Sequence, residues 1–95
     1  MMRGNIDYNL RPSPLIWACF KGNYKIVWHL LKLGLDWEEI DGFGNNSMHQ
    51  AAAGDNLEVV KILLLWGARG GIKNTRGHEA KELATNQEII ILLDT

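Results

Sequence analysis

The fold is decided by the stretch Asn46-Ser47-Met48-His49-Gln50-Ala51-Ala52, which is followed by Leu57-Glu58-Val59-Val60-Lys61-Ile62-Leu63-Leu64 and then by Gly67. The first segment carries small residues on one side, and the second is apolar at helical spacing. Gly54 separates the two segments, and Gly67 stands where a glycine commonly ends a helix. The stretch therefore predicts two short helices joined by a tight turn.

The same pattern recurs at an offset of 33 residues, the distance from Ala18 to Ala51. This offset also superposes five other identical pairs: Asn23 on Asn56, Val27 on Val60, Leu30 on Leu63, Leu31 on Leu64 and Gly34 on Gly67. A further step sets Gly44 on Gly77 and Ala51 on Ala84, after which the third copy is about three residues shorter. One helix pair cannot cover its own apolar face, so the copies must stack.

These copies divide the chain into four parts. Residues 1–11 form a lead-in and a first turn, residues 12–40 a first unit, residues 41–73 a second, and residues 74–95 a shortened third. Each full unit is expected to hold a glycine-rich turn, a short helix, a second turn, a second helix and a loop. We therefore expect an all-α fold.

Two segments resemble the ankyrin repeat. Residues 46–52 stand where that family has Thr-Pro-Leu-His-x-Ala-Ala, and residues 13–19, Ser13-Pro14-Leu15-Ile16-Trp17-Ala18-Cys19, are a second match. The resemblance covers about residues 8–95 and implies a solenoid of stacked helix-turn-helix units with protruding β-turn loops. It also implies that the imidazole of His49 bonds backbone groups of the adjoining turn. Asp55 replaces the family's glycine after the first helix, and we expect Gly54 to shift that turn by one residue.

The resemblance further implies that the chain binds another protein through its turn tips and the face of its first helices. Mapped onto this sequence, the predicted protein-binding residues are Leu10, Pro12, Trp17, Phe20, Lys21, Phe43, Asn45, Ala53, Thr75, Arg76 and His78. Phe43 is the sharpest candidate, because a phenylalanine between two turn glycines finds little to pack against. The alternative is that Phe43 leans on the neighbouring turn beside Leu10.

The tryptophans divide into three groups. Trp37 is expected to pack between units, whereas Trp17 fits packing and binding equally well. Trp28 and Trp66 stand at outer-helix positions that are normally exposed. They serve an interface, in which indoles are enriched, or they cover neighbouring aliphatic side chains.

The formal net charge of -1 gives no overall basic field, and we expect no nucleic-acid partner. The charge is segregated, however: the loop Asp36–Asp41 is acidic, whereas the loop that carries Arg69, Lys73 and Arg76 is basic. We expect these loops to form adjacent stripes that orient a partner or attract each other. The longest apolar run, Ile62–Trp66, is too short to span a bilayer, so no membrane partner is expected.

Cys19 is the single cysteine, which favours a reducing compartment, namely the cytoplasm, with the nucleus as the alternative. Cys19 is expected to be a small core residue rather than a nucleophile. The three histidines are far apart and match no zinc spacing, and Ser13 and Ser47 fall where the repeat caps or buries them. We therefore predict no catalysis, no metal and no cofactor.

Two functions remain open. The first is a protein-interaction module, which loses little entropy on docking because it is rigid. The second is a structural segment that caps or positions a larger protein. The first unit lacks a polar capping helix and is expected to expose Leu15, Trp17 and Trp28, so the chain is a monomer or associates weakly with itself through that end.

Overall fold

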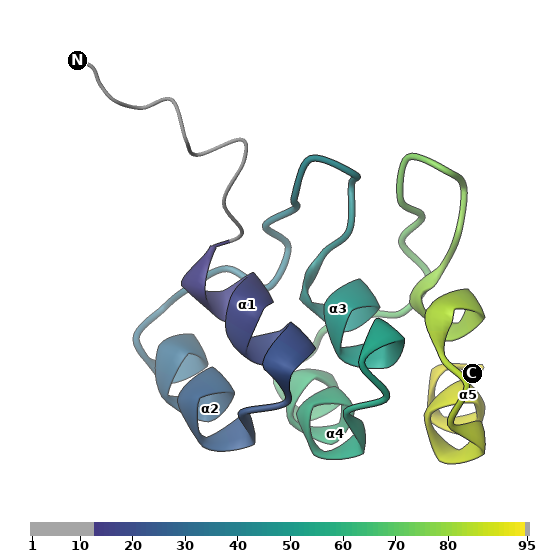
Figure 1. Cartoon of the computed structure of the whole chain (residues 1–95). Helices are drawn as coiled ribbons and strands as arrows, with labels where there is room; N and C mark the ends of the chain where they lie inside the picture. The colour runs from purple at the N-terminus through teal and green to yellow at the C-terminus, as the bar shows by residue number, and fades with distance from the viewer. Residues whose placement is uncertain (1–12, 95) are drawn as a thin grey trace.

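A computed structural model describes residues 13–94, and these residues form helices and no strand (Figure 1). The first unit consists of α1 (Pro14–Lys21) and α2 (Tyr24–Lys32), and the second of α3 (Ser47–Ala53) and α4 (Leu57–Leu65). The third unit consists of the 3₁₀ helix η2 (Ala80–Leu83) and α5 (Gln87–Leu93). The prediction of stacked helix pairs is confirmed.

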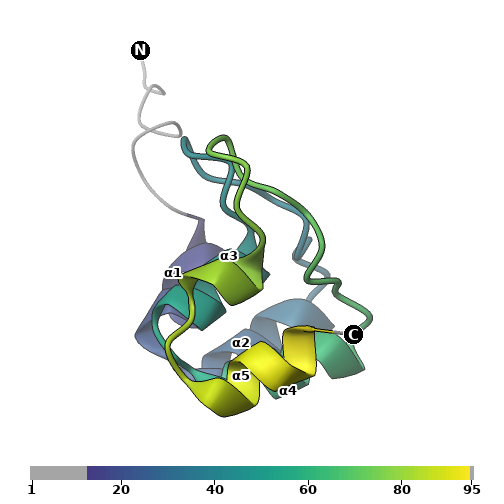
Figure 2. The ribbon, with the colours of Figure 1, turned by 90° about the vertical axis from the view of Figure 1, so that its right-hand side faces the viewer.

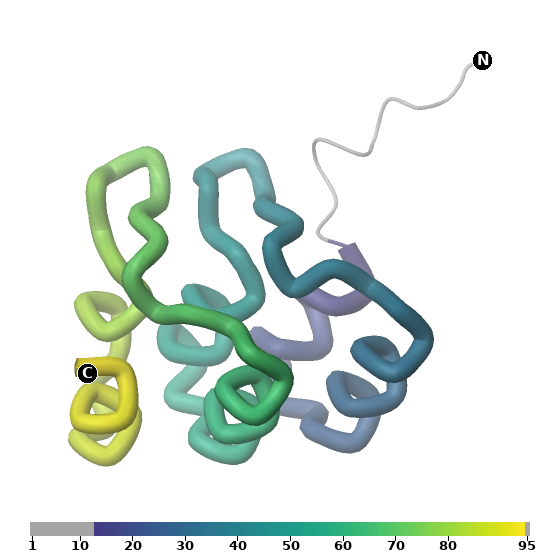
Figure 3. The backbone as a smooth tube through the Cα atoms, turned by 180° about the vertical axis from the view of Figure 1, so that it is seen from behind, coloured from purple at the N-terminus to yellow at the C-terminus, as the bar shows by residue number. Residues whose placement is uncertain are grey.

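The six helices lie in two rows. The first helices of the three units, α1, α3 and η2, form an inner row, and α2, α4 and α5 form an outer row below it (Figure 1). Two long turns rise beyond the inner row, and we call them finger 1 (residues 41–45) and finger 2 (residues 74–78). The view along the stack shows both fingers projecting from the same side of the helices (Figure 2). From behind, the loops that follow α2 and α4 run upward into these fingers (Figure 3).

The inner helices begin at equivalent residues, Ser13, Asn46 and Glu79, which are 33 apart. The Ser13 hydroxyl accepts the Ile16 amide at 3.1 Å, and Asn46 Oδ1 accepts the His49 amide at 3.0 Å. These bonds satisfy amides that a helix start leaves without partners. In the third unit, Glu82 Oε2 accepts the Glu79 amide at 2.8 Å. Glu82 thus does locally what His49 Nδ1 does when it accepts the Asn46 amide at 3.1 Å.

The turns between paired helices correct one expectation. Gly22 ends α1 with φ 79°, in the left-handed region that glycine enters without strain. In the second unit Gly54 has φ -86°, and Asp55 adopts the positive φ of 54°. The expected shift of the turn onto Gly54 is therefore wrong. Asp55 occupies the glycine's position itself, since its carboxylate finds partners in the third unit.

The core lies between the two rows and runs through all three units. Its largest side chains are fully buried: Leu15, Leu31, Met48, Leu63 and Ile89. Cys19 is buried among them, and burial raises the pKa of its thiol to about 12, which confirms it as a core residue. Trp37 is half-buried against this core, as expected. The expectation that Leu15 would be exposed is wrong, because α1 turns this side chain inward.

Candidate protein-binding surface

Each finger is folded around one polar side chain at its base. Asp41 Oδ1 accepts the amides of Phe43 at 2.8 Å and Asn45 at 3.0 Å. In finger 2, Asn74 Oδ1 accepts the amides of Arg76 and His78, both at 3.0 Å. Such side-chain bonds to amides two and four residues ahead stabilise tight turns. The local sequence therefore fixes the shape of both tips.

The two fingers are also bonded to each other. Thr75 donates its amide (3.0 Å) and its hydroxyl (2.8 Å) to the Phe43 carbonyl, and Asn74 Nδ2 donates to Asn45 Oδ1 at 2.8 Å. A Cβ on Gly44 would lie 2.9 Å from the Thr75 nitrogen, so the fingers approach as closely as a glycine permits. The pair forms one rigid platform.

His49 adds a link beneath this platform. Its Nε2 lies 2.9 Å from the His78 carbonyl, while its Nδ1 accepts the Asn46 amide. The ring is buried, and both nitrogens bond backbone groups, one of them in the adjoining finger. The structural role implied for His49 is confirmed.

Phe43 stands at the tip of finger 1 with its side chain free. Its backbone carbonyl binds Thr75, yet the residue is 67% exposed, the largest exposure of any described aromatic residue. Leu10, against which it was alternatively expected to lean, lies outside the described residues, as does Pro12. Arg76, at the tip of finger 2, is exposed as well.

The inner row contributes a second set of exposed side chains, all at the end of α1. Trp17 is 52% exposed and Phe20 46%, which favours the binding interpretation of Trp17 over packing. Lys21 places its ammonium 5.1 Å from the centre of the Trp17 ring, a cation–π contact that holds both side chains together. At the offset of 33, Ala53 takes the place of Phe20 and is exposed on α3.

The other predicted residues also hold the fingers in shape. Asn45 is half-buried and accepts the amide of Asn74, Thr75 bonds finger 1, and the His78 carbonyl accepts from His49. We refer to Trp17, Phe20, Lys21, Phe43, Ala53 and Arg76 as the candidate surface, because these residues keep their side chains available.

Sequence reasoning did not find two features. Gln50, at the position of Trp17, donates to Asp41 Oδ2 at 2.8 Å and so ties α3 to finger 1. Trp28 and Trp66 meet edge to face with ring centres 5.2 Å apart, so each indole partly covers the other on the outer row. Their spacing of 38 residues differs from the repeat offset, and the offset alone could not have paired them.

The described residues bring no nucleophile and base together at an exposed site. Ser47 and His49 are buried, Cys19 is a core thiol, and residues 13–94 hold no group of His, Cys, Asp and Glu that could bind a metal ion. No helix among these residues is both long and apolar enough to cross a bilayer.

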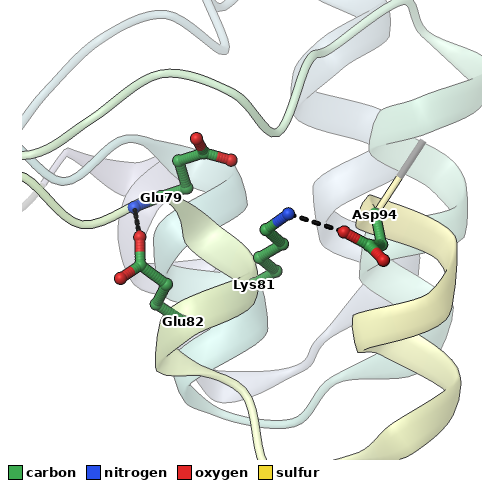
Figure 4. A network of polar contacts seen from close by, with 4 residues as sticks. All are labelled: Glu79, Lys81, Glu82 and Asp94. Atoms are coloured by element: carbon green, nitrogen blue, oxygen red, sulfur yellow. Dashed lines mark hydrogen bonds and ion pairs between the residues drawn. The ribbon is translucent and has the colours of Figure 1, made fainter.

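One open groove of about 630 Å³ lies away from the candidate surface. It runs between residues 68–72, η2 and the end of α5, beside an ion pair of 2.6 Å between Lys81 and Asp94. Figure 4 shows this pair bridging η2 and α5, with Glu82 bonded to the Glu79 amide nearby. The pairing raises the pKa of Lys81 and lowers that of Asp94, and both side chains remain solvated.

Stacked helix pairs with paired fingers define a class of repeat protein, and comparison with known families shows which one. Residues 2–93 match the family model described as "Ankyrin repeats (3 copies)". The chain therefore belongs to the ankyrin-repeat family. Proteins of this family are generally protein-interaction modules and typically not enzymes.

Several relatives cover most of this chain. It is 35% identical over 78 residues to a probable palmitoyltransferase AKR2 of Saccharomyces uvarum, which spans 82% of this chain and 10% of that protein. It is 30% identical over 78 residues to the human ankyrin repeat and SOCS box protein 5, again 82% of this chain and 23% of that protein. A putative ankyrin repeat protein FPV219 of fowlpox virus is 37% identical over 68 residues, 72% of this chain and 16% of that protein.

The chain thus spans only about a tenth to a quarter of the length of these relatives. What the alignments share is the repeat array.

Proposed function

We propose that this chain is a non-catalytic module that binds a partner protein through the candidate surface. The observation that carries the proposal is the exposure of Phe43 on a pair of fingers held by bonds between and within them. A rigid platform loses little conformational entropy on docking, and exposed aromatic side chains supply much of the binding energy at interfaces. Trp17 and Phe20 extend this aromatic surface onto α1.

The proposal is tested by affinity capture from the source cells, with the wild-type chain beside a Phe43→Ala, Arg76→Ala double variant. We expect partners of the wild type to be depleted about 10-fold by the double variant, since interface aromatics contribute about 1–3 kcal/mol. Leu65→Ala, which removes an exposed apolar side chain from α4, is the matched control and should retain the partners. Equal recovery by all three chains, each folded by circular dichroism, would refute the proposed site.

A second function, structural capping or positioning within a larger assembly, is favoured by one specific observation. Ile26 on α2 is 47% exposed, whereas the equivalent Val59 and Ile89 are completely buried by the preceding unit. The first unit thus presents an apolar face that the other units cover. If this face associates, light scattering should show a mass that rises with concentration and an Ile26→Ser variant that stays monomeric. A concentration-independent monomer would exclude self-association through this face.

As part of the same proposal, we place the protein in the cytoplasm or nucleus, with no nucleic-acid or membrane partner. The single described cysteine, buried and unpaired, supports a reducing compartment. Imaging of the tagged protein tests the location.

A further inference from the structure

The inner helices of the first two units differ from most protein surface in the sign of their charges. The segments Pro14–Lys21 and Ser47–Ala53 contain one cation, Lys21, and no aspartate or glutamate. The only other titratable side chains in them are the thiol of Cys19 and the imidazole of His49, and both are buried. Around this row, the charges that a partner meets must come from the fingers and turns.

The acidic side chains in those fingers and turns are already engaged. Asp41 accepts two amides through Oδ1 and the Gln50 side chain through Oδ2. Asp55 accepts two amides through Oδ1 and the Thr85 hydroxyl through Oδ2. Each oxygen of both carboxylates therefore points into the molecule, toward a donor that a partner's cation would have to compete with.

The cations at the same surface have no such partners. Within residues 13–94, the single ion pair is that of Lys81 with Asp94, so neither Lys21 nor Arg76 has a carboxylate within reach. Lys21 ends α1 and Arg76 tips finger 2, so the two cations border the candidate surface on opposite edges. Glu79 and Glu82 lie beyond, on the third unit, where the surface turns acidic.

Apolar contact is available between these cations. Trp17 and Phe20 stand out from α1, while α3 carries Gln50 and Ala53 at the equivalent positions. An apolar side chain of a partner can rest against Phe20 over the methyl group of Ala53 without meeting a charged group of either inner helix.

We infer that the candidate surface takes an acidic segment of a partner protein, whose carboxylates meet Lys21 and Arg76 and whose apolar side chains contact Phe20, Trp17 and Phe43. This inference rests on the proposed function and names its partner's chemistry. A basic segment would bring its cations against free cations and against carboxylates that are already bonded.

The test is selection of a random displayed-peptide library on the purified full chain. We expect recovered peptides to be enriched in aspartate and glutamate beside aromatic or aliphatic residues. A fluorescent peptide of that kind should bind about 10-fold more weakly to a Lys21→Glu, Arg76→Glu variant, and its affinity should fall with added salt. The matched control is Lys25→Glu, Lys61→Glu, which makes the same change in net charge on the outer helices and should bind as the wild type does.

Recovered peptides that are neutral or basic, or no recovery at all, would overturn the inference. So would equal weakening by both double variants, because that result would reflect net charge alone. The proposed function fails separately. If Phe43→Ala abolishes peptide binding while charge reversal leaves it unchanged, the surface binds partners but not by their acidity. If Phe43→Ala has no effect, the site itself is wrong.

Discussion

The turn between α1 and α2 and the turn between α3 and α4 occupy equivalent places, yet they do different work. In the first, Gly22 adopts positive φ and Asn23 caps its own helix, accepting the Ile26 amide at 3.3 Å. In the second, Asn56 caps nothing and donates to the carbonyls of Cys19 at 2.7 Å and Phe20 at 2.8 Å. The first turn serves its own unit, whereas the second reaches back to the unit before it.

The second turn also reaches forward. Asp55 accepts the amides of Thr85 at 2.9 Å and Asn86 at 3.0 Å, and the Thr85 hydroxyl at 2.5 Å. Two consecutive residues thus tie the middle unit to both neighbours. A non-glycine residue at positive φ carries strain, and here the strained residue is the one that makes the bonds. A glycine relieves strain at a turn, while a side chain there can join units.

The largest effect that would break this contrast is expected from Gly22→Ala. A Cβ on Gly22 would lie 2.6 Å from Asn56 Oδ1, and its φ of 79° disfavours any side chain. Backbone strain and the loss of the Asn56 bonds together should lower the free energy of unfolding by about 3 kcal/mol. Urea unfolding measures this loss.

Gly67→Ala is the matched control for that prediction. Gly67 has a φ of 99°, but a Cβ there meets nothing within 4 Å, so only the strain applies. We expect a loss of about 1 kcal/mol. If both variants lose the same amount, Asn56 does not fill the space beside Gly22.

A middle-sized effect should separate the two asparagines. Asn56→Ala leaves the carbonyls of Cys19 and Phe20 without their donor and should cost about 2 kcal/mol, whereas Asn23→Ala loses one helix cap at about 1 kcal/mol. Thermal unfolding of both variants measures the difference. A larger loss from Asn23→Ala would mean that capping outweighs the link between units.

The smallest effect concerns Asp55, whose carboxylate is fully solvated. The Thr85 hydroxyl, then the amides of Thr85 and Asn86, hold the pKa of Asp55 below its ordinary value of 3.8. Because the folded pKa is the lower one, the stabilisation is present above pH 3.8 and is lost as the pH falls through the folded value. Asp55→Asn should therefore unfold at slightly lower urea at pH 7, by less than Asn56→Ala does.

That difference between wild type and Asp55→Asn should narrow below pH 3.8. Glu58→Gln removes the charge of an exposed carboxylate on α4 and serves as the control. A difference for Asp55→Asn that stays constant down to pH 2 would show that its charge does not matter to the link.

Much of the fold followed from the offset of 33 residues. It placed the helix starts at Ser13 and Asn46, the core at Met48 and Leu63, and Phe43 on an exposed tip. These features repeat, so one copy informs the next.

What the offset could not supply are the features that differ between copies. Positive φ favours Gly54 over Asp55 on local grounds, and only the donors 30 residues later, at Thr85, reverse that preference. The pairing of Trp28 with Trp66 depends on how two helices lie in space. The burial of Leu15 depends on the core that all three units share, which a unit considered alone does not contain.

The amide of Asn56 beside Gly22 has a consequence for how such a chain can be rearranged. If the middle unit were copied so that it followed itself, the asparagine of the second copy would meet an aspartate, with its Cβ, where it now meets a glycine. The collision would penalise that duplication, although each unit alone is unchanged. The units are therefore not interchangeable bricks. Their order is written in which residue stands at each turn, and a recombined or engineered array would have to move Gly22 and Asn56 as a matched pair.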